Sequence, residues 1–217
     1  MNANDFTADS FVAKCAWAVM CGLVIARSTS LAQDSSKDYR PYNQGPLTAA
    51  DFRGKPDSNQ FEAYTCCSIQ YNFRYRYETR GNVTTAKLAD VDFFAVILRD
   101  KSWNVSTDKK SLMDHEQGHF DIAQASALAT KFALLKQIKS DVPLTATGNS
   151  EETAVANLQQ KLNAAIQVIE RKIDESHAEY DRQTKHGRDG NPQREHRAQQ
   201  LKLVKYYTEE IQRLAGK

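Results

Sequence analysis

Two histidines four residues apart, with a glutamate beside the first, are the residues of this sequence best placed to do chemistry. Residues 115–120 read HEQGHF. On a helix His115 and His119 lie one turn apart on the same side, so both imidazoles can bind one zinc ion at about 2.0–2.1 Å. Glu116 lies beside them and does not ligate; it can take a proton from a water that the zinc activates and deliver it to a leaving amine. The motif therefore predicts one Zn²⁺ ion and hydrolysis of an amide bond.

A catalytic zinc site also needs a third protein ligand and an open fourth position. The candidates lie further along the chain, at His177, Asp181 and His186, whereas His196 is expected to be solvated. If two long helices form a hairpin about position 144, the level of residue 117 is met by about residue 171, roughly two turns from His177 and nearly three from Asp181. This estimate mildly favours His177 over His186 and leaves the choice open.

The elements before the motif have the period of β-strands. From residue 61 to residue 78 polar and apolar side chains alternate, with one face formed by Ile69, Tyr71, Phe73, Tyr75 and Tyr77. Such alternation predicts a half-buried strand, followed by a turn at 80–82 and a second strand at 91–98. Together they predict a small antiparallel sheet with one solvated face.

The pattern then changes to the period of helices. Asp108 is the expected N-cap of a helix that runs to about residue 139 and carries the motif. A loop at 140–148 leads to a second helix from about Ser150, which the HGRDGNP segment ends near residue 186. Asn191 as N-cap and Pro192 at the first position begin a third helix. The fold class is therefore α+β: a small antiparallel sheet, a long helical hairpin that carries HExxH, and a C-terminal helix.

Residues 1–32 have the features of a secretory signal peptide. Lys14 precedes an apolar run from residue 15 to residue 26, and Ser30 and Ala32 have the spacing of a signal-peptidase site. The alternative is a buried N-terminal helix. Cleavage after Ala32 would leave an extended lead-in at 33–46 and one metallopeptidase domain at 47–217, in a secreted or periplasmic protein.

Composition excludes several other classes of protein. The chain has 29 Lys and Arg against 27 Asp and Glu, a formal net charge of +2, so there is no electrostatic case for binding nucleic acid. No apolar run is long enough to span a bilayer, so the mature chain should have no membrane span. Only Cys66 and Cys67 remain after cleavage, and adjacent cysteines predict no disulfide framework.

Two segments together carry a resemblance to a known family. HEQGHFDIA followed by YDRQTKHG resembles the bacterial family of predicted secreted zinc-dependent proteases catalogued as domain of unknown function 922. LTAADFRGKPD resembles the opening of that family, and Lys101-Ser102-Trp103 resembles the end of its sheet, so the resemblance covers roughly residues 47 to 200.

The resemblance implies a site centred on the HExxH residues and completed by the second segment, whose members are Tyr180, Asp181, Thr184 and His186. His177 is not part of the family pattern and is expected to be a core or surface histidine. We favour His186 as the third zinc ligand, with Asp181 accepting a hydrogen bond from an imidazole. The alternative is Asp181 as ligand, with His186 stabilising the oxyanion. Tyr180 and Thr184 are expected to stabilise the transition state or to position other groups, and Asp121 to cap or to pair at the surface.

The expected function is therefore that of a zinc metallopeptidase acting on peptides or proteins outside the cytoplasm. One alternative is a zinc-stabilised envelope scaffold without turnover, against which the intact Glu116 argues. Another is a zinc amidase acting on cell-wall peptide, whose chemistry on an amide bond is the same.

Overall fold

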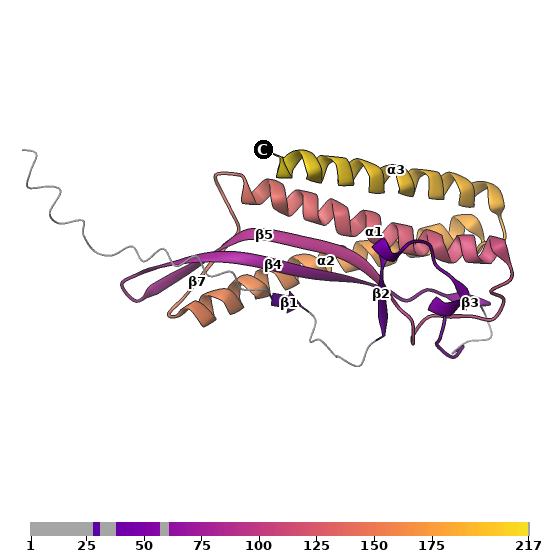
Figure 1. Cartoon of the computed structure of the whole chain (residues 1–217), viewed down its shortest axis with the longest axis horizontal. Helices are drawn as coiled ribbons and strands as arrows, with labels where there is room; N and C mark the ends of the chain where they lie inside the picture. Colours follow the sequence, from indigo (N-terminus) through magenta and orange to yellow (C-terminus); the bar gives the residue numbers. More distant parts are fainter. Residues whose placement is uncertain (1–27, 31–37, 57–60, 217) are drawn as a thin grey trace, which may run out of the picture.

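The computed structural model describes residues 28–30, 38–56 and 61–216. An antiparallel sheet comes first and three long helices follow, so the expected α+β class is confirmed (Figure 1). The main sheet has the order β1-β4-β5-β2, with β7 added beside β5. Its strands are β1 (Ser28–Ser30), β2 (Tyr39–Pro41), β4 (Cys67–Arg80), β5 (Val83–Leu98) and β7 (Thr145–Gly148).

A long hairpin of β4 and β5 forms the centre of the sheet. Its turn has two residues, and Gly81 at the first position has a φ of +62°, a conformation that glycine adopts without steric cost. The expected alternation is present in β4, where one face is buried and the polar face is half-exposed or exposed. The sheet therefore has one covered and one solvated face, as predicted.

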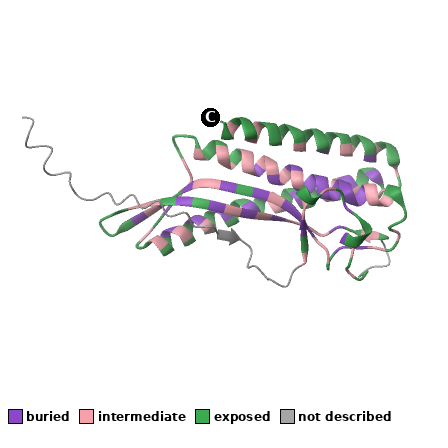
Figure 2. Cartoon of the chain, in the orientation of Figure 1, coloured by how far each residue is buried: buried purple, intermediate pink, exposed green. Residues whose placement is uncertain are grey.

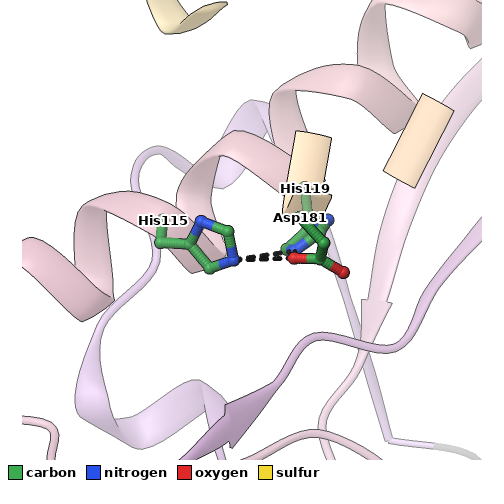
Figure 3. A group of neighbouring side chains, drawn as sticks. All are labelled: His115, His119 and Asp181. Carbon is green, nitrogen blue, oxygen red and sulfur yellow. Dashed lines mark hydrogen bonds and ion pairs between the residues drawn. The ribbon is translucent and has the colours of Figure 1, made fainter. Parts of the chain in front are cut away.

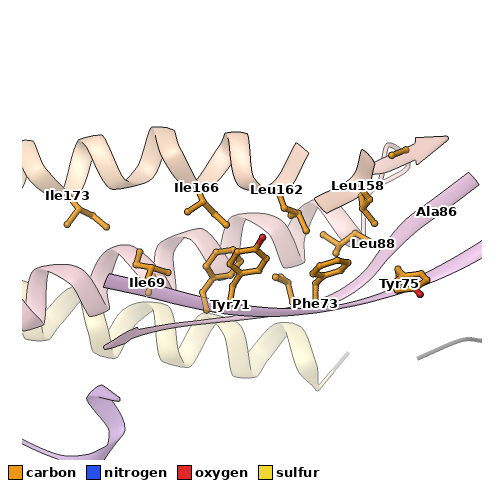
Figure 4. Close-up of a cluster of buried hydrophobic side chains, with 14 of the residues drawn as sticks. Ile69, Tyr71, Phe73, Tyr75, Ala86, Leu88, Leu158, Leu162, Ile166 and Ile173 are labelled. Carbon is orange, nitrogen blue, oxygen red and sulfur yellow. The ribbon is translucent and has the colours of Figure 1, made fainter. Parts of the chain in front are cut away.

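Two helices cover the apolar face of the hairpin. They are α1 (Lys110–Ile138) and α2 (Glu151–Thr184). Figure 4 shows the stripe of α2, Leu158, Leu162, Ile166 and Ile173, facing the buried aromatic side chains of β4. Because these side chains are almost fully removed from water, truncating one such leucine to alanine costs about 2–5 kcal/mol.

The third helix, α3 (Gly190–Ala215), packs along α1. Its contacts include a hydrogen bond from Gln193 Nε2 to the Ser111 carbonyl and an ion pair between Arg197 and Asp114. With the sheet, α2 and α3 around it, α1 is buried on all sides from residue 115 to residue 123 (Figure 2). The HExxH segment is thus the most enclosed part of the helical layer.

Several element boundaries differ from the sequence-based expectation. β5 begins at Val83 instead of residue 91, because pairing with β4 continues up to the two-residue turn. The sequence did not indicate this first half of β5, since its buried positions include Thr84 and Ala86, which give little apolar signal. The expected loop at 140–148 contains β7, which pairs with β5. The segment expected to open β4 forms instead β3 (Ala63–Tyr64), paired with β6 (Trp103–Asn104). The N-caps of α1 and α3 are Lys109 and Asp189 in place of Asp108 and Asn191, and α2 begins at Glu151, beside the expected start near Ser150.

The start of the chain contributes more to the fold than an extended lead-in would. Arg40 in β2 donates hydrogen bonds to the carbonyls of Gln44, Gly45 and Pro46, and short 3₁₀ helices follow at Tyr42–Gln44 and Ala49–Asp51. The expected signal peptide lies outside the described residues apart from β1. In the described part of the chain, no helix combines the length and the apolar character needed to cross a membrane.

Candidate metal centre

The two histidines of the motif converge as the helical spacing predicts. His115 and His119 lie in the buried first half of α1, and their Nε2 atoms are 3.2 Å apart. Their rings are nearly perpendicular, at 82°, with centroids 4.8 Å apart. The two nitrogens therefore point at one place from two directions, as two ligands of a single ion do.

Asp181 on α2 completes a group of three. Its Oδ1 is 2.9 Å from His115 Nε2 and 3.1 Å from His119 Nε2 (Figure 3). Two atoms bound at about 2.0–2.1 Å to one tetrahedral zinc lie roughly 3.3 Å apart, close to these separations. Among the described residues, these three side chains are the group of His, Cys, Asp and Glu whose ligand atoms all lie within 4.8 Å of one another. The antiparallel course of α1 and α2 brings the start of one helix to the end of the other.

The hydrogen bonds behind the His115 ring determine which of its nitrogens carries a proton. Thr184 is fully buried, and its hydroxyl donates to the Tyr180 carbonyl at 2.7 Å. The same oxygen lies 3.4 Å from His115 Nδ1 and can only accept there, which favours a proton on Nδ1 and a lone pair on Nε2. In that tautomer a lone pair on His115 Nε2 faces the carboxylate oxygen of Asp181 at 2.9 Å. Two electron-rich atoms this close need a cation between them, either a metal ion or a proton.

Asp181 remains a carboxylate in this environment. In the metal-free site, where protons on the two imidazoles occupy the place of a cation, burial favours the protonated form of Asp181, but hydrogen bonds from His115 and His119 and their charge outweigh burial and hold the pKa of Asp181 well below its usual range. The group therefore offers two imidazoles and one anionic oxygen. That donor set fits zinc, which takes histidine and carboxylate ligands and leaves a fourth position open in catalytic sites.

The Tyr180 ring packs against both histidines of the motif. It stacks on His115 with centroids 4.8 Å apart at 13°, and meets His119 edge-on at 5.1 Å. Its hydroxyl is buried without a hydrogen-bond partner in the described structure, and burial raises the pKa of Tyr180 strongly. Tyr180 thus holds the rings in place instead of presenting its hydroxyl to a cleft. Gly118 makes this possible, because a Cβ at that position would lie 2.2 Å from the Tyr180 hydroxyl.

We expect Gly118→Ala to destabilise the metal-free protein by about 1–3 kcal/mol, since Tyr180 has no room to move away. Thermal unfolding measures the effect. The matched control is Gly190→Ala, where the added Cβ meets only the mobile end of Arg194 at 3.3 Å, so its melting temperature should stay near that of the parent. Equal melting temperatures for the two variants would contradict the packing argument.

Glu116, beside His115 in the chain, lines the same cleft as the three metal-binding candidates. It is 2% exposed, and its Oε2 accepts a hydrogen bond from the Thr65 hydroxyl at 2.5 Å. Burial raises the pKa of Glu116, opposed by the charge of His119 and the hydrogen bond from Thr65. A buried carboxylate with a raised pKa is suited to accept and return a proton. Thr65, in the loop between β3 and β4, carried no signal in the sequence.

The cleft has a volume of about 940 Å³ and lies between the β3 segment and the ends of α1 and α2. Its rim includes His186, in a loop where Lys185, His186 and Gly187 all have positive φ values. This turn brings Gly187 against His115, so that a Cβ on Gly187 would lie 2.9 Å from the His115 Cβ. The end of α2 therefore closes tightly over the motif.

The structure favours a different candidate for the third ligand from the one that the sequence favoured. His186, the favoured candidate, has a half-exposed side chain whose Nδ1 is 3.4 Å from Asp181 Oδ1, and it lies outside the group of three. Asp181, the alternative, lies within it. His177 is directly behind His119, with the Nδ1 atoms of the two rings 3.0 Å apart. The helical-hairpin estimate set residue 171 level with the motif, whereas the structure sets Asp181 there. His177, expected to be a core or surface histidine, lies outside the group of three but against His119.

Asp121 also differs from expectation. It is 1% exposed, so the expected capping or surface role is wrong. Its carboxylate accepts hydrogen bonds from the Tyr42 hydroxyl at 2.8 Å and from Gln117 at 2.7 Å, and pairs with Arg197 at 3.4 Å. Gln117 in turn accepts from the Leu47 backbone N–H at 2.7 Å. These contacts hold α1 to the N-terminal segment and to α3.

Comparisons with known proteins point to one family. A family model described as a bacterial protein of unknown function (DUF922) matches residues 46–187, well over half of the chain. This range includes the group of three, Glu116, Thr65, His177 and His186, but neither Tyr42 nor α3. No curated protein and no solved structure matches this chain. The matched segment begins between the two 3₁₀ helices and ends in the loop that carries His186. The chain therefore belongs to the DUF922 family of bacterial proteins.

Proposed function

We propose that this protein is a zinc-dependent peptidase, with His115, His119 and Asp181 as the metal ligands and Glu116 as the general base. The observation that carries the proposal is the buried Glu116 carboxylate in the same cleft as a group of two imidazoles and one carboxylate. Zinc bound there would act as a Lewis acid that polarises a carbonyl and lowers the pKa of a water. A metal site with a purely structural role has no use for a buried, hydrogen-bonded glutamate beside it.

Other side chains would assist proton transfer, stabilise developing charge and orient the His115 ring. Thr65 holds one oxygen of Glu116, which leaves the other free to receive a proton from the attacking water and to pass it to the leaving amine. With Asp181 as ligand, His186 at the rim of the cleft is free to donate a hydrogen bond to the carbonyl oxygen as negative charge develops on it. Thr184 and Tyr180 act through the His115 ring, which they orient.

We further propose that the protein works outside the cytoplasm. The support is the N-terminal segment, in which a basic residue, an apolar run and the Ser30-Leu31-Ala32 site follow one another. Cleavage after Ala32 would remove β1 together with the segment before it. Mass spectrometry of the exported protein should find Gln33 as its first residue, and an intact Met1 in that fraction would rule out cleavage.

Metal-dependent turnover tests the proposed activity. The purified chain should hold one zinc ion per molecule by elemental analysis and should cleave members of a mixed peptide library. A chelator should abolish cleavage, and added zinc should restore it. A chain that holds zinc but cleaves neither peptides nor cell-wall peptide amides would instead be the zinc-stabilised scaffold, and cleavage of cell-wall peptide amides alone would identify an amidase.

A further inference from the structure

His177 lies behind the metal-binding group and does not belong to it. Its Nδ1 is 3.0 Å from His119 Nδ1, whereas the other nitrogen of His119 faces Asp181 and His115. The His177 and His119 rings meet at 60° with centroids 4.9 Å apart. His119 is therefore held at both ring nitrogens, by the metal-binding group on one side and by a second histidine on the other.

A hydrogen bond between two Nδ1 atoms needs one proton and one lone pair. A neutral imidazole carries one N–H and one lone pair, so His177 can accept at Nδ1 when its own proton is on Nε2. If His119 offers the Nε2 lone pair to a metal, its proton must be on Nδ1, which is the atom that faces His177. The two requirements agree: His119 donates and His177 accepts.

We propose that His177 is a positioning residue for the metal centre, which accepts a hydrogen bond from His119 Nδ1 and so fixes the tautomer and orientation of that ligand. This inference rests on the proposed metal site, though not on peptidase activity. A hydrogen-bond partner on the far nitrogen of a metal-binding histidine is worth about 10- to 100-fold in metal affinity or activity. Here the partner is a neutral imidazole from the neighbouring helix, and Thr184 has the corresponding place behind His115.

The experiment compares metal affinity in His177→Leu, His177→Gln and Gln167→Leu. Leucine removes the acceptor, so we expect zinc affinity, measured by chelator competition, to fall by about 10- to 100-fold. Glutamine retains an acceptor oxygen and should recover most of that loss. Gln167 is exposed on the same helix and does not line the cleft, so Gln167→Leu should bind zinc like the parent.

Two spectroscopic measurements separate positioning from a general structural effect. In the cobalt-substituted parent and His177→Gln, the visible absorption of the metal should be alike, whereas His177→Leu should alter it because the His119 ring is less constrained. Long-range ¹H–¹⁵N spectra of the zinc-loaded parent should show the His119 proton on Nδ1 and the His177 proton on Nε2. The opposite tautomers would overturn the proposal.

The outcomes also distinguish this inference from the proposed function. If the parent binds zinc and His177→Leu binds it equally well, the positioning role is wrong and the peptidase proposal stands. If zinc affinity depends on His177 as described but no peptide is cleaved, the peptidase proposal fails alone. Complete loss of zinc from both folded His177 variants would make His177 a ligand, and absence of zinc from the parent would remove both proposals.

Discussion

Glu116→Gln should retain zinc and the native fold while losing most of its turnover, by on the order of 10²-fold or more. The amide of glutamine has nearly the size of the carboxylate and can still bond to the Thr65 hydroxyl, so the packing around the buried side chain should survive. It cannot accept the proton of an attacking water, because its nitrogen carries no available lone pair and its oxygen is a very weak base. The loss should appear in kcat more than in KM.

The matched control for this variant is Glu175→Gln on the exposed side of α2, which changes the same charge away from the cleft. Its turnover should equal that of the parent. Zinc content by elemental analysis and circular dichroism should show that Glu116→Gln is loaded and folded. Unchanged hydrolysis by loaded Glu116→Gln would remove Glu116 from the mechanism.

Asp181→Ala should lose zinc at stoichiometric concentrations, whereas His186→Ala should keep it. Asp181 contributes the one anionic oxygen of the group, and without it two imidazoles remain, a set with one ligand fewer than catalytic zinc needs. The loss of affinity should exceed the roughly 100-fold that marks the removal of a supporting hydrogen bond. His186→Ala removes only a half-exposed ring from the rim, so its defect should be in turnover.

Thermal unfolding supplies a second readout for the same pair. A ligand present at 100 times its dissociation constant stabilises the native state by about 2.7 kcal/mol. Added zinc should therefore raise the melting temperature of the parent and of His186→Ala, and should leave Asp181→Ala unchanged. If His186→Ala loses the zinc-dependent rise and Asp181→Ala keeps it, the two assignments must be exchanged.

The centre of the site could be read from the sequence because its geometry is local. The relative placement of His115, Glu116 and His119 depends only on α1 being helical, and the spacing of apolar residues around the motif predicts that helix. The same holds for the alternation of β4 and for the start of α2 near Ser150. Each of these features is decided by residues within a few turns of one another.

Features that depend on how the elements pack were missed or misplaced. The first half of β5 is a strand because it continues the pairing with β4, and β7 is a strand because β5 offers it an edge; neither has a strong pattern of its own. Thr65 reaches Glu116 across 51 residues of sequence, and nothing near Thr65 marks it as a partner. Contacts at such separations depend on tertiary structure.

The difference between local features and features set by tertiary packing is clearest at Asp181, His186 and His177. The sequence by itself determined which few side chains could supply the third ligand, and its resemblance to the family predicted that the second segment would meet the motif. The choice among them depends on the rotation of α2 about its axis and on the turn that ends it. That rotation is set by the packing of its apolar stripe on β4, which directs Asp181 to the two Nε2 atoms and His177 to the far side of His119. The positive φ values of Lys185, His186 and Gly187 then carry His186 to the rim. Only the tertiary structure decided these placements, because a change of one helical position turns a side chain by about 100° and exchanges one candidate for another.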